Sequence, residues 1–377
     1  MSAVPVRLKD VAAHAGVSVK TVSNVVNGYT HVSAAMAARV QASIDALGYR
    51  PNLAARQLKH GRGGFLALAL PQLDSPYFAD LAARLHDGAT KRGYLFLLDI
   101  TGAGYEHERV ALSGMRAHVV DGVIFSPLTI TAEDITARSD DLPLVLLGER
   151  RAPAQVDHVA VDSVAASRAV GEHLIAGGRR RLAVIGHQEQ EGTATVRLRG
   201  FREAVQAAGL DLPPDRVASV AAYDRADGYA AMQRLLALPG DERPDGVFAF
   251  NDLLAIGALR ACHEAGVRVP DDVAVVGFDN LPEGAYGACS LSSVAPDMDE
   301  LADAVLDLLV ARIEGSNAPP QDVSVGWRLE IRESSAPSPS ASSRPGRSGL
   351  RDVGPAGVAG HDVNRWVGLL PRDELGR

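Results

Sequence analysis

The spacing of hydrophobic residues divides the chain into two parts. From residue 6 to residue 49, apolar side chains recur every three or four positions, which is the period of an amphipathic helix. Ser18 and Ser33 stand where helix N-caps belong, and Gly48 stands where a glycine commonly ends a helix. The pattern therefore predicts three short helices, over Leu8 to about Ala15, Val19 to about Val26, and Ala34 to Leu47.

From Gly64 onward, short apolar runs alternate with amphipathic stretches. Buried strands followed by helices that often end at glycine are typical of parallel sheets in a doubly wound α/β fold. So many strands favour two similar lobes over one sheet, and the extended segment 159–163 is a place for the chain to cross between them. The other predicted strands lie within residues 65–70, 94–100, 122–128, 143–148, 181–186, 246–251 and 273–278.

A short interruption separates the first two N-terminal helices. Gly16 can adopt the left-handed turn conformation without a Cβ clash, Ala12 is small where the helices cross, and Val22 can pack back against the first helix. This spacing predicts a helix-turn-helix, whose second helix enters the major groove of DNA. The alternative is a generic helical hairpin. The residues expected to contact DNA are Ser18, Val19, Lys20, Thr21, Ser23 and Asn24.

Each of these side chains suits a particular kind of DNA contact. Lys20 can donate to guanine O6 and N7, and Asn24 can pair with a base edge or a phosphate. Val19 can touch a thymine methyl group. Thr21 and Ser23 are suited to phosphates, and such contacts position a protein on the duplex without specifying a sequence.

The distribution of charge favours the same partner. The full sequence carries a net charge of −8, yet residues 1–62 hold eight Lys and Arg against two Asp, a net charge of +6. The remaining residues therefore carry −14. A basic head on an acidic body indicates that the head meets a polyanion, although a solvated basic face would give the same count.

Composition argues against several other classes of protein. A hydrophobic content of 46% and a charged content of 22% are ordinary for a soluble globular protein. No apolar run is long enough to span a membrane, and the N-terminus lacks a secretory signal. Cys262 and Cys289 give neither a disulfide framework nor metal-ligand spacing. With no phosphate loop and no nucleophile elbow, we expect a cytoplasmic protein that is not an enzyme and uses no metal or cofactor.

The N-terminal motif, which begins RLKDVAAHAGVSVKTVSNVVNG at Arg7, resembles the head of the LacI/GalR family of bacterial transcriptional regulators. The resemblance extends to about Glu333 and implies an all-α head, a hinge helix and a two-lobed core similar to periplasmic sugar-binding proteins. Residues 334–377 are rich in Ser, Pro and Gly and are expected to be a mostly disordered tail. The expected divisions are a head (1–50), a hinge (51–62), an N-lobe (about 63–162 and 295–320) and a C-lobe (about 163–294 and 321–333).

The segment PNLAARQL (51–58) matches the hinge helix of that family, which becomes ordered when two copies meet in the minor groove of a palindromic operator. The resemblance implies that Leu58 wedges between central base pairs, with the small Ala55 beside it. Asn52 and Arg56 are expected to reach phosphates or groove edges. The alternative is a flexible linker in which Leu58 only covers part of a lobe.

The resemblance also implies an effector site between the lobes, where open α/β sheets usually bind ligands. Tyr77 and Phe78 are expected to stack on a ring, Arg197 to donate hydrogen bonds, and Met298 to line the floor. For single residues the alternatives are structural, since Asp252 could simply cap the following helix and Asp279 could serve a turn. The complete predicted set is Tyr77, Phe78, Ser126, Arg197, Tyr223, Asn251, Asp279 and Met298.

The chemistry of this set favours a sugar over a purine as the effector. Arg197 only donates, Asp279 only accepts and Asn251 does both, which suits adjacent hydroxyl groups. Some sugar-responsive members have an acidic residue where Gly148 stands, and the neighbouring Glu149 is expected to point to the opposite face of an extended segment.

We therefore expect a homodimeric repressor that binds a palindromic double-stranded DNA operator and responds to a small molecule in the cleft. The helix predicted after Pro76 is expected to contribute to the dimer interface. The alternative functions are a sugar-binding protein and a sugar-active enzyme on the same core, neither of which controls genes. No membrane partner is expected.

Overall fold

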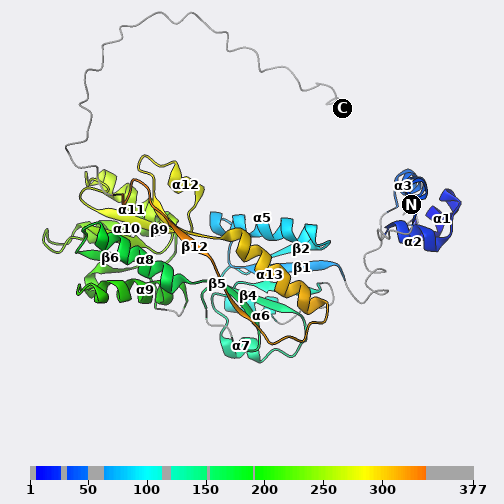
Figure 1. Cartoon of the computed structure of the whole chain (residues 1–377), viewed down its shortest axis with the longest axis horizontal. Helices are drawn as coiled ribbons and strands as arrows, with labels where there is room; N and C mark the ends of the chain where they lie inside the picture. The colour runs from blue at the N-terminus through cyan, green and yellow to red at the C-terminus, as the bar shows by residue number, and fades with distance from the viewer. Residues whose placement is uncertain are drawn as a thin grey trace, which may run out of the picture. The chain divides into compact units, whose positions relative to one another are not determined.

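The computed structural model describes residues 6–26, 32–49, 63–112, 120–150, 153–189 and 192–336. Within these ranges the chain forms a small helical head and a larger α/β body with two six-stranded sheets. Figure 1 shows the helices of the head and, in the body, helices on both faces of each sheet. None of the helices in these ranges is long and apolar enough to cross a lipid bilayer.

The head confirms the helices and turns expected from the sequence. Gly16 has a φ of 60° after the first helix, and Gly48 has a φ of 61° after the third, so both occupy the left-handed region. The Ser33 hydroxyl accepts a hydrogen bond from the Met36 amide at 3.4 Å. The helices are α1 (Leu8–Ala15), α2 (Val19–Val26) and α3 (Ala34–Leu47). Their shared core is formed by Val11, Ala12, Ala15, Val22, Val40 and Tyr49.

The N-lobe is built on a parallel sheet with the strand order β11-β5-β4-β3-β1-β2. Leu66, Leu68 and Leu70 alternate along β1 and pack in one core cluster, while Ala67 and Ala69 pack in another, because successive strand residues face opposite sides. The strands are β1 (Phe65–Leu70), β2 (Leu95–Ile100), β3 (Gly122–Phe125), β4 (Leu144–Leu147), β5 (Asp157–Val161) and β11 (Asp322–Val325). The helices are α5 (Pro76–Lys91), α6 (Tyr105–Leu112), α7 (Ala132–Thr136) and α13 (Met298–Ile313).

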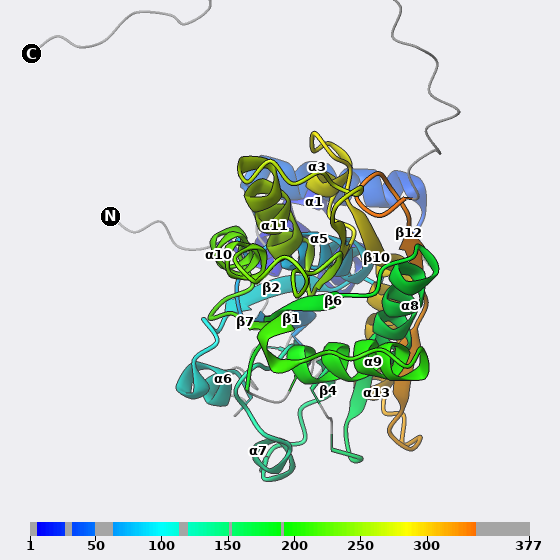
Figure 2. The same cartoon turned by 90° about the vertical axis from the view of Figure 1, so that its left-hand side faces the viewer.

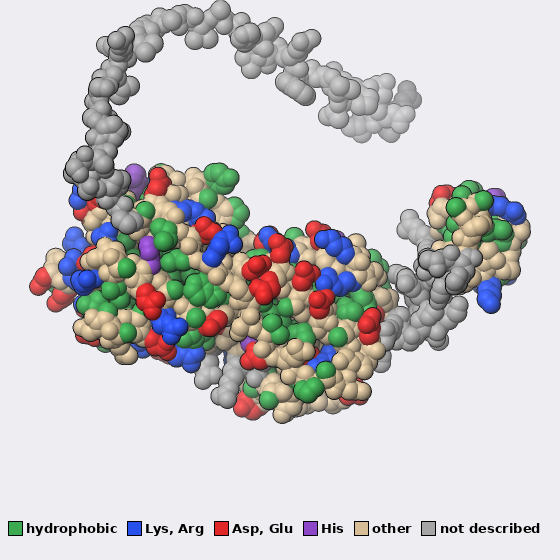
Figure 3. Space-filling view, viewed as in Figure 1, with side chains coloured by type: hydrophobic (Ala, Val, Ile, Leu, Met, Phe, Trp, Pro, Cys, Tyr) green, Lys and Arg blue, Asp and Glu red, His purple; other side chains and the backbone are tan. Residues whose placement is uncertain are grey.

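Helix α13 belongs to the N-lobe although it comes from the far end of the chain. It packs beside α5, and Figure 3 shows acidic and basic side chains gathered over this pair of helices. Arg92 pairs with Asp303 at 3.0 Å and with Asp307 at 2.6 Å, and Arg84 pairs with Asp299. These ion pairs are at the surface, so burial of the leucines of α13 contributes most of the attachment.

The C-lobe sheet has the strand order β12-β10-β9-β8-β6-β7, and only β12 runs antiparallel to its neighbour. The helix pairs α8–α9 and α10–α11 lie on opposite sides of β6 (Figure 2). The strands are β6 (Leu182–His187), β7 (Val217–Ser219), β8 (Gly246–Ala249), β9 (Ala274–Phe278), β10 (Ser292–Pro296) and β12 (Trp327–Glu330). The helices are α8 (Ser163–Ala176), α9 (Thr193–Ala207), α10 (Arg225–Leu236), α11 (Asp252–Glu264), α12 (Pro282–Ala285) and a 3-10 turn (Pro214–Arg216).

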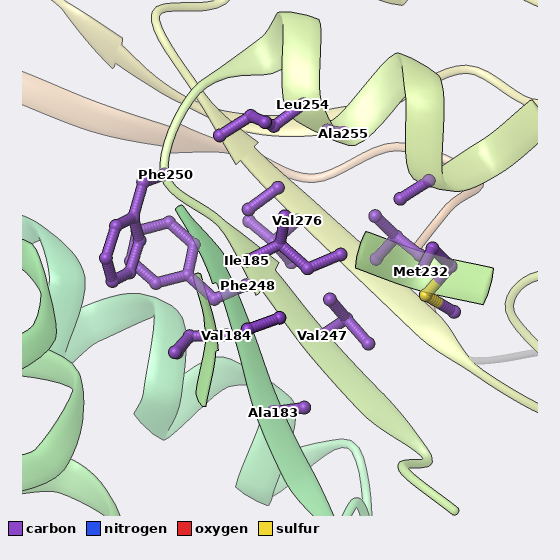
Figure 4. Close-up of a cluster of buried hydrophobic side chains, with 14 of the residues drawn as sticks. Ala183, Val184, Ile185, Met232, Val247, Phe248, Phe250, Leu254, Ala255 and Val276 are labelled. Carbon is purple, nitrogen blue, oxygen red and sulfur yellow. The ribbon is translucent and has the colours of Figure 1, made fainter. Parts of the chain in front are cut away.

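The core of the C-lobe contains several aromatic rings. Figure 4 shows Phe248 and Phe250 side by side, and their ring centroids are 5.3 Å apart with the edge of one facing the other. Both side chains are fully buried. Gly186 faces this cluster with a φ of 126°, and a Cβ there would lie 2.6 Å from the Cβ of Phe250. The end of β6 is therefore fixed closely against the residues that follow β8.

The chain crosses between the lobes after β5, as the sequence predicts, since β5 lies in the N-lobe sheet and α8 packs in the C-lobe. The expected later boundaries are wrong. Residues 295–296 belong to β10 of the C-lobe, and residues 322–325 form β11, which pairs with β5 of the N-lobe. β7, β10, β11 and β12 were not predicted because they are short or rich in polar residues.

The C-lobe also extends past its expected end at Glu333. Ser334 and Ser335 are buried, and the Ser334 hydroxyl accepts from the Ser292 amide at 2.8 Å and donates to the Val275 carbonyl at 2.6 Å. The predicted tail therefore begins at least three residues later. Residues 337–377 lie outside the described residues.

A single carboxylate fixes the point at which the chain enters the body. Asp121, immediately before β3, accepts hydrogen bonds from the amides of Gly63 and Gly64, each at 2.6 Å. Charge-assisted bonds to backbone amides are among the stronger hydrogen bonds in proteins. The residues just before β1 are therefore held beside β3, the strand with which β1 pairs.

We expect Gly257→Ala to destabilise the C-lobe although alanine normally favours a helix. A Cβ at Gly257 would lie 2.0 Å from the carbonyl oxygen of Arg225, where α11 crosses α10. Such overpacking typically costs ~1–3 kcal/mol in the free energy of unfolding. Gly240→Ala is the control, since a Cβ there meets nothing within 4 Å. Urea unfolding curves measure both, and equal midpoints would contradict the proposed close packing.

Candidate functional site

A cavity of about 480 Å³ lies between the two lobes. Residues that follow β1, β3, β4, β8 and β9 contribute to its lining, because the carboxyl ends of parallel strands meet at one edge of a sheet. Seven of the eight residues predicted for the effector site line it: Tyr77, Phe78, Ser126, Arg197, Tyr223, Asn251 and Asp279.

Met298 is the exception. It is the first residue of α13, is partly buried, and packs against the core of the N-lobe. Pro296 and Leu301, on either side of it in the sequence, line the cavity instead. The expectation that Met298 lines the floor is therefore wrong, because the start of the helix directs neighbouring residues to different sides.

Arg197 is the central positive charge of the cavity. It projects from α9, is only 8% exposed, and donates from Nε and Nη2 to Glu149 Oε1 at 3.0 and 2.8 Å. Its guanidinium also donates to the Phe250 carbonyl and lies 3.4 Å from the ring centroid of Phe278. Burial alone would lower the pKa of Arg197, but the charges of Glu149 and Asp279 raise it overall. The side chain is therefore a fixed cation.

Glu149 is the acidic residue that the sequence analysis placed on the wrong face. The expectation assumed an extended backbone, but Gly148 has a φ of 106°, which ends the alternation of β4 and turns the next side chain into the cavity. The carboxylate forms the ion pair with Arg197 and accepts from the Ser163 hydroxyl. Its Oε2 is buried and has no hydrogen-bond partner among the described residues.

Asp279 supplies the second acidic group. It follows β9, lines the cavity, and has its Oδ1 3.9 Å from Nη1 of Arg197. Burial raises the pKa of Asp279 well above the ordinary range of an aspartate, and the positive charge of Arg197 only partly opposes this. A carboxyl with a raised pKa can either accept a hydrogen bond or donate one.

Asn251 and Tyr223 form a connected pair on the C-lobe side. The Asn251 side chain caps α11 by accepting from the Leu254 amide at 2.9 Å, and it donates to the Tyr223 carbonyl at 3.2 Å. The Tyr223 hydroxyl donates to the Gly186 carbonyl at 2.8 Å. Asn251 therefore provides the helix cap that the sequence analysis had offered as an alternative role for Asp252.

Aromatic side chains cover the other side of the cavity. Tyr77 and Phe78 are in an edge-to-face arrangement with ring centroids 5.2 Å apart. Burial, together with the negative charges of Asp279 and Glu149, raises the pKa of Tyr77, so its hydroxyl stays protonated. The sequence analysis missed Gln188 and Phe278, which line the same cavity. Both lie at or just beyond the ends of predicted strands, the signal that would have identified them.

The head brings the predicted DNA-contacting residues to one helix. Val22 is fully buried, whereas Val19 is 47% exposed and Lys20 is exposed. The Ser18 hydroxyl accepts from the Thr21 amide at 3.0 Å and so caps α2. Ser23 and Asn24 are half-buried. The predicted hinge contacts Asn52, Ala55, Arg56 and Leu58 lie outside the described residues.

Arg39 holds the turn of this motif in place. Its Nε donates to the Ala15 carbonyl at 2.6 Å, and its Nη2 donates to the Gly16 carbonyl at 3.1 Å. These two carbonyls are at the end of α1, where no further turn of helix satisfies them. The sequence analysis counted Arg39 only as part of the basic charge of the head.

The comparisons with known proteins agree with both halves of this arrangement. Residues 7–52 match the LacI family of bacterial regulatory proteins, and residues 172–335 match a periplasmic binding protein-like domain. A relative described as the HTH-type transcriptional repressor PurR, from Escherichia coli O139:H28, is 31% identical over 88% of this chain and 97% of its own. This chain belongs to the LacI family.

Solved structures of LacI-family regulators share the fold. A putative regulator of this family from Sanguibacter keddieii is 40% identical, covers 73% of this chain and 99% of its own, and has a TM-score of 0.67. The CelR–cellobiose complex is 33% identical over 87% of this chain and 99% of its own, with a TM-score of 0.65. The lac repressor dimer bound to operator is 25% identical over 88% and 99%, with a TM-score of 0.76.

We expect Arg197→Met to be more damaging alone than together with Glu149→Gln. The single change leaves the carboxylate of Glu149 buried without its counter-charge, which typically costs ~3–5 kcal/mol. The double change removes both charges and should recover much of that loss. Urea unfolding measures the free energy of unfolding of each variant. Equal losses of stability in the two variants would show that the ion pair does not form in solution.

Proposed function

We propose that this chain is a transcriptional repressor that binds a palindromic operator as a homodimer and is controlled by a small molecule in the interlobe cavity. The observation that carries the proposal is the presence, in one chain, of a helix-turn-helix and of a cavity lined by converging polar groups. The relatives named above are described as regulators, and none is described as an enzyme. We infer that it acts in the cytoplasm, where its DNA is.

The DNA-binding proposal is supported by the surface of α2. Val22 holds this helix against α1, which leaves Val19 and Lys20 free to approach base edges. Ser18 and Thr21 share a hydrogen bond between their hydroxyls at 2.8 Å and are suited to phosphate contacts at the start of the helix. We further propose that the segment 51–62 becomes a hinge helix, with Leu58 as the minor-groove wedge.

The effector is proposed to be a neutral polyol such as a sugar. Glu149 and Asp279 flank Arg197, so an anionic ligand would meet two carboxyl groups for one guanidinium. Hydroxyl groups can donate to the carboxyls and accept from the guanidinium, while the rings of Tyr77 and Phe78 can cover an apolar face. A regulator bound to cellobiose is a structural neighbour, which favours a sugar over a purine.

The cavity lies between lobes that the chain joins by several crossings, so binding there can change the angle between them. A change in the N-lobe would alter the separation of the two hinge segments in a dimer. Coupling between two such sites is typically worth ~1–3 kcal/mol.

We expect Lys20→Ala to weaken operator binding by about tenfold or more, because a good base contact is worth ~1–3 kcal/mol. The operator is first selected from random DNA with the purified protein, and affinities are then measured by fluorescence anisotropy. Arg202→Ala, an exposed change in α9 of the C-lobe, is the control. Equal affinities for the two variants would remove Lys20 from the interface, and no preference for any palindrome would refute the DNA-binding proposal.

We expect the double variant Arg197→Met/Glu149→Gln to retain operator binding but to lose the response of that binding to effector. The two changes remove the charged hydrogen-bonding groups at the centre of the cavity and leave the head unaltered. Operator affinity is measured with and without each member of a sugar and nucleobase panel. A variant that responds as the wild type does would show that the effector binds elsewhere.

A further inference from the structure

The loop after β9 holds two consecutive non-glycine residues in the left-handed region. Asp279 has a φ of 103° and Asn280 a φ of 52°. Side chains with a Cβ avoid this region, and such residues persist only where the surrounding structure over-determines them. Asp279 is one of the two acidic groups that flank Arg197 in the cavity. The strained backbone therefore directs a group of the proposed effector site.

Three hydrogen bonds hold this loop against the C-lobe. The Asp279 amide donates to the Val294 carbonyl at 2.9 Å. The Asn280 amide donates to the Ser293 hydroxyl at 3.0 Å, and the Leu281 amide donates to Asp252 Oδ2 at 2.6 Å. The Ser293 hydroxyl in turn donates to Asp252 Oδ1 at 2.6 Å. One carboxyl group thus supports two of the three backbone anchors, one directly and one through Ser293.

Asp252 has no other evident role. Asn251 provides the cap of α11, and Asp252 is fully buried and has no ion-pair partner among the described residues. Its position also depends on a glycine, since a Cβ at Gly277 would lie 2.1 Å from Asp252 Oδ1. Burial raises the pKa of Asp252 to about 7, against the opposing effect of its hydrogen bonds and of Arg332 and Arg197. Such burial disfavours the charged carboxylate, and the loop contacts offset part of that cost.

We propose that Asp252 is a positioning residue for effector binding, which keeps Asp279 directed into the cavity by holding the left-handed backbone of residues 279–280. Asp252 itself is not among the residues that line the cavity. The inference rests on the proposed effector site. Part of the affinity of that site then depends on a side chain that does not line the cavity.

The test is a double-mutant cycle between Asp252→Asn and Asn280→Gly. Asparagine keeps the shape of Asp252 but presents an amide group to one of its two hydrogen-bond donors, and glycine adopts the left-handed conformation without strain. Binding of cellobiose and of D-ribose is measured by calorimetry on the full chain. Asp252→Asn is expected to weaken binding by about tenfold or more in the wild-type background and by less than about threefold beside Asn280→Gly.

Asn280→Gly also removes a contact, because Arg332 Nη2 donates to Asn280 Oδ1 at 2.6 Å. The affinity of the Asn280→Gly variant is therefore measured as well, and the effect of Asp252→Asn beside Asn280→Gly is calculated relative to it. Glu264→Gln is the matched carboxyl-to-amide control on the same helix, where the side chain is exposed and pairs with Arg260. Equal losses from Asp252→Asn in both backgrounds, or wild-type binding in that variant, would overturn the proposal.

A second measurement needs no ligand. Carbon-13 labelling of aspartate carboxyls reports the pKa of Asp279, assigned with Asp279→Asn. Burial is the main cause that raises the pKa of Asp279 in the wild type, and the negative charge of Asp252 also raises it. Asp252→Asn removes that charge in any background, so the pKa of Asp279 should fall further in Asp252→Asn alone, where the side chain also becomes exposed to water, than in Asp252→Asn beside Asn280→Gly. Equal falls in the two backgrounds would overturn the proposal. If neither sugar binds the wild type, the assignment of the effector as one of these sugars fails, while this titration still decides the role of Asp252.

Discussion

Arg197 places a permanent positive charge in a cavity that offers it little water, and the surrounding structure compensates for that charge. A buried guanidinium is tolerated only when its hydrogen bonds and its charge are both matched. Glu149 of the N-lobe forms an ion pair with Arg197. From the C-lobe, the Phe250 carbonyl accepts a hydrogen bond from Arg197, and the ring of Phe278 packs against its guanidinium. The same group that is suited to bind an effector therefore also joins the lobes, and ligand recognition and domain geometry share one electrostatic centre.

Polar residues that follow strands could be predicted to converge because strand ends meet at one edge of a sheet. Arg197, Asn251 and Asp279 were implied by the resemblance to the LacI/GalR family; Asn251 and Asp279 follow strands β8 and β9, whereas Arg197 projects from α9. The head helices were predicted to within a residue because their caps and turns are local signals. Glu149 was misplaced because a single positive φ at Gly148 breaks the alternation on which the expectation rested. A glycine permits such an angle, but the residues around Gly148 do not form a helix-end pattern like those at Gly16 and Gly48 that would indicate it.

The strands that escaped prediction share a different physical cause. β10, β11 and β12 obtain their places from pairing with distant strands, and β11 joins a sheet whose other members end at residue 161. Their own sequences are short and partly polar, so periodicity gives little signal. Likewise, the burial of Ser334 and Ser335 depends on contacts with β9 and β10 that composition alone does not indicate. Long-range pairing thus determined the features that sequence reasoning missed.

The attachment of Gly63 and Gly64 to Asp121 has a mechanical consequence. Because both amides are bound to the residue before β3, residues 63 and 64 move together with the N-lobe sheet. A rotation of the N-lobe therefore also rotates the point at which the chain enters it. The hydrogen bonds that Gly63 and Gly64 make within the described residues all come from the N-lobe, so the C-lobe acts on this entry point through the N-lobe.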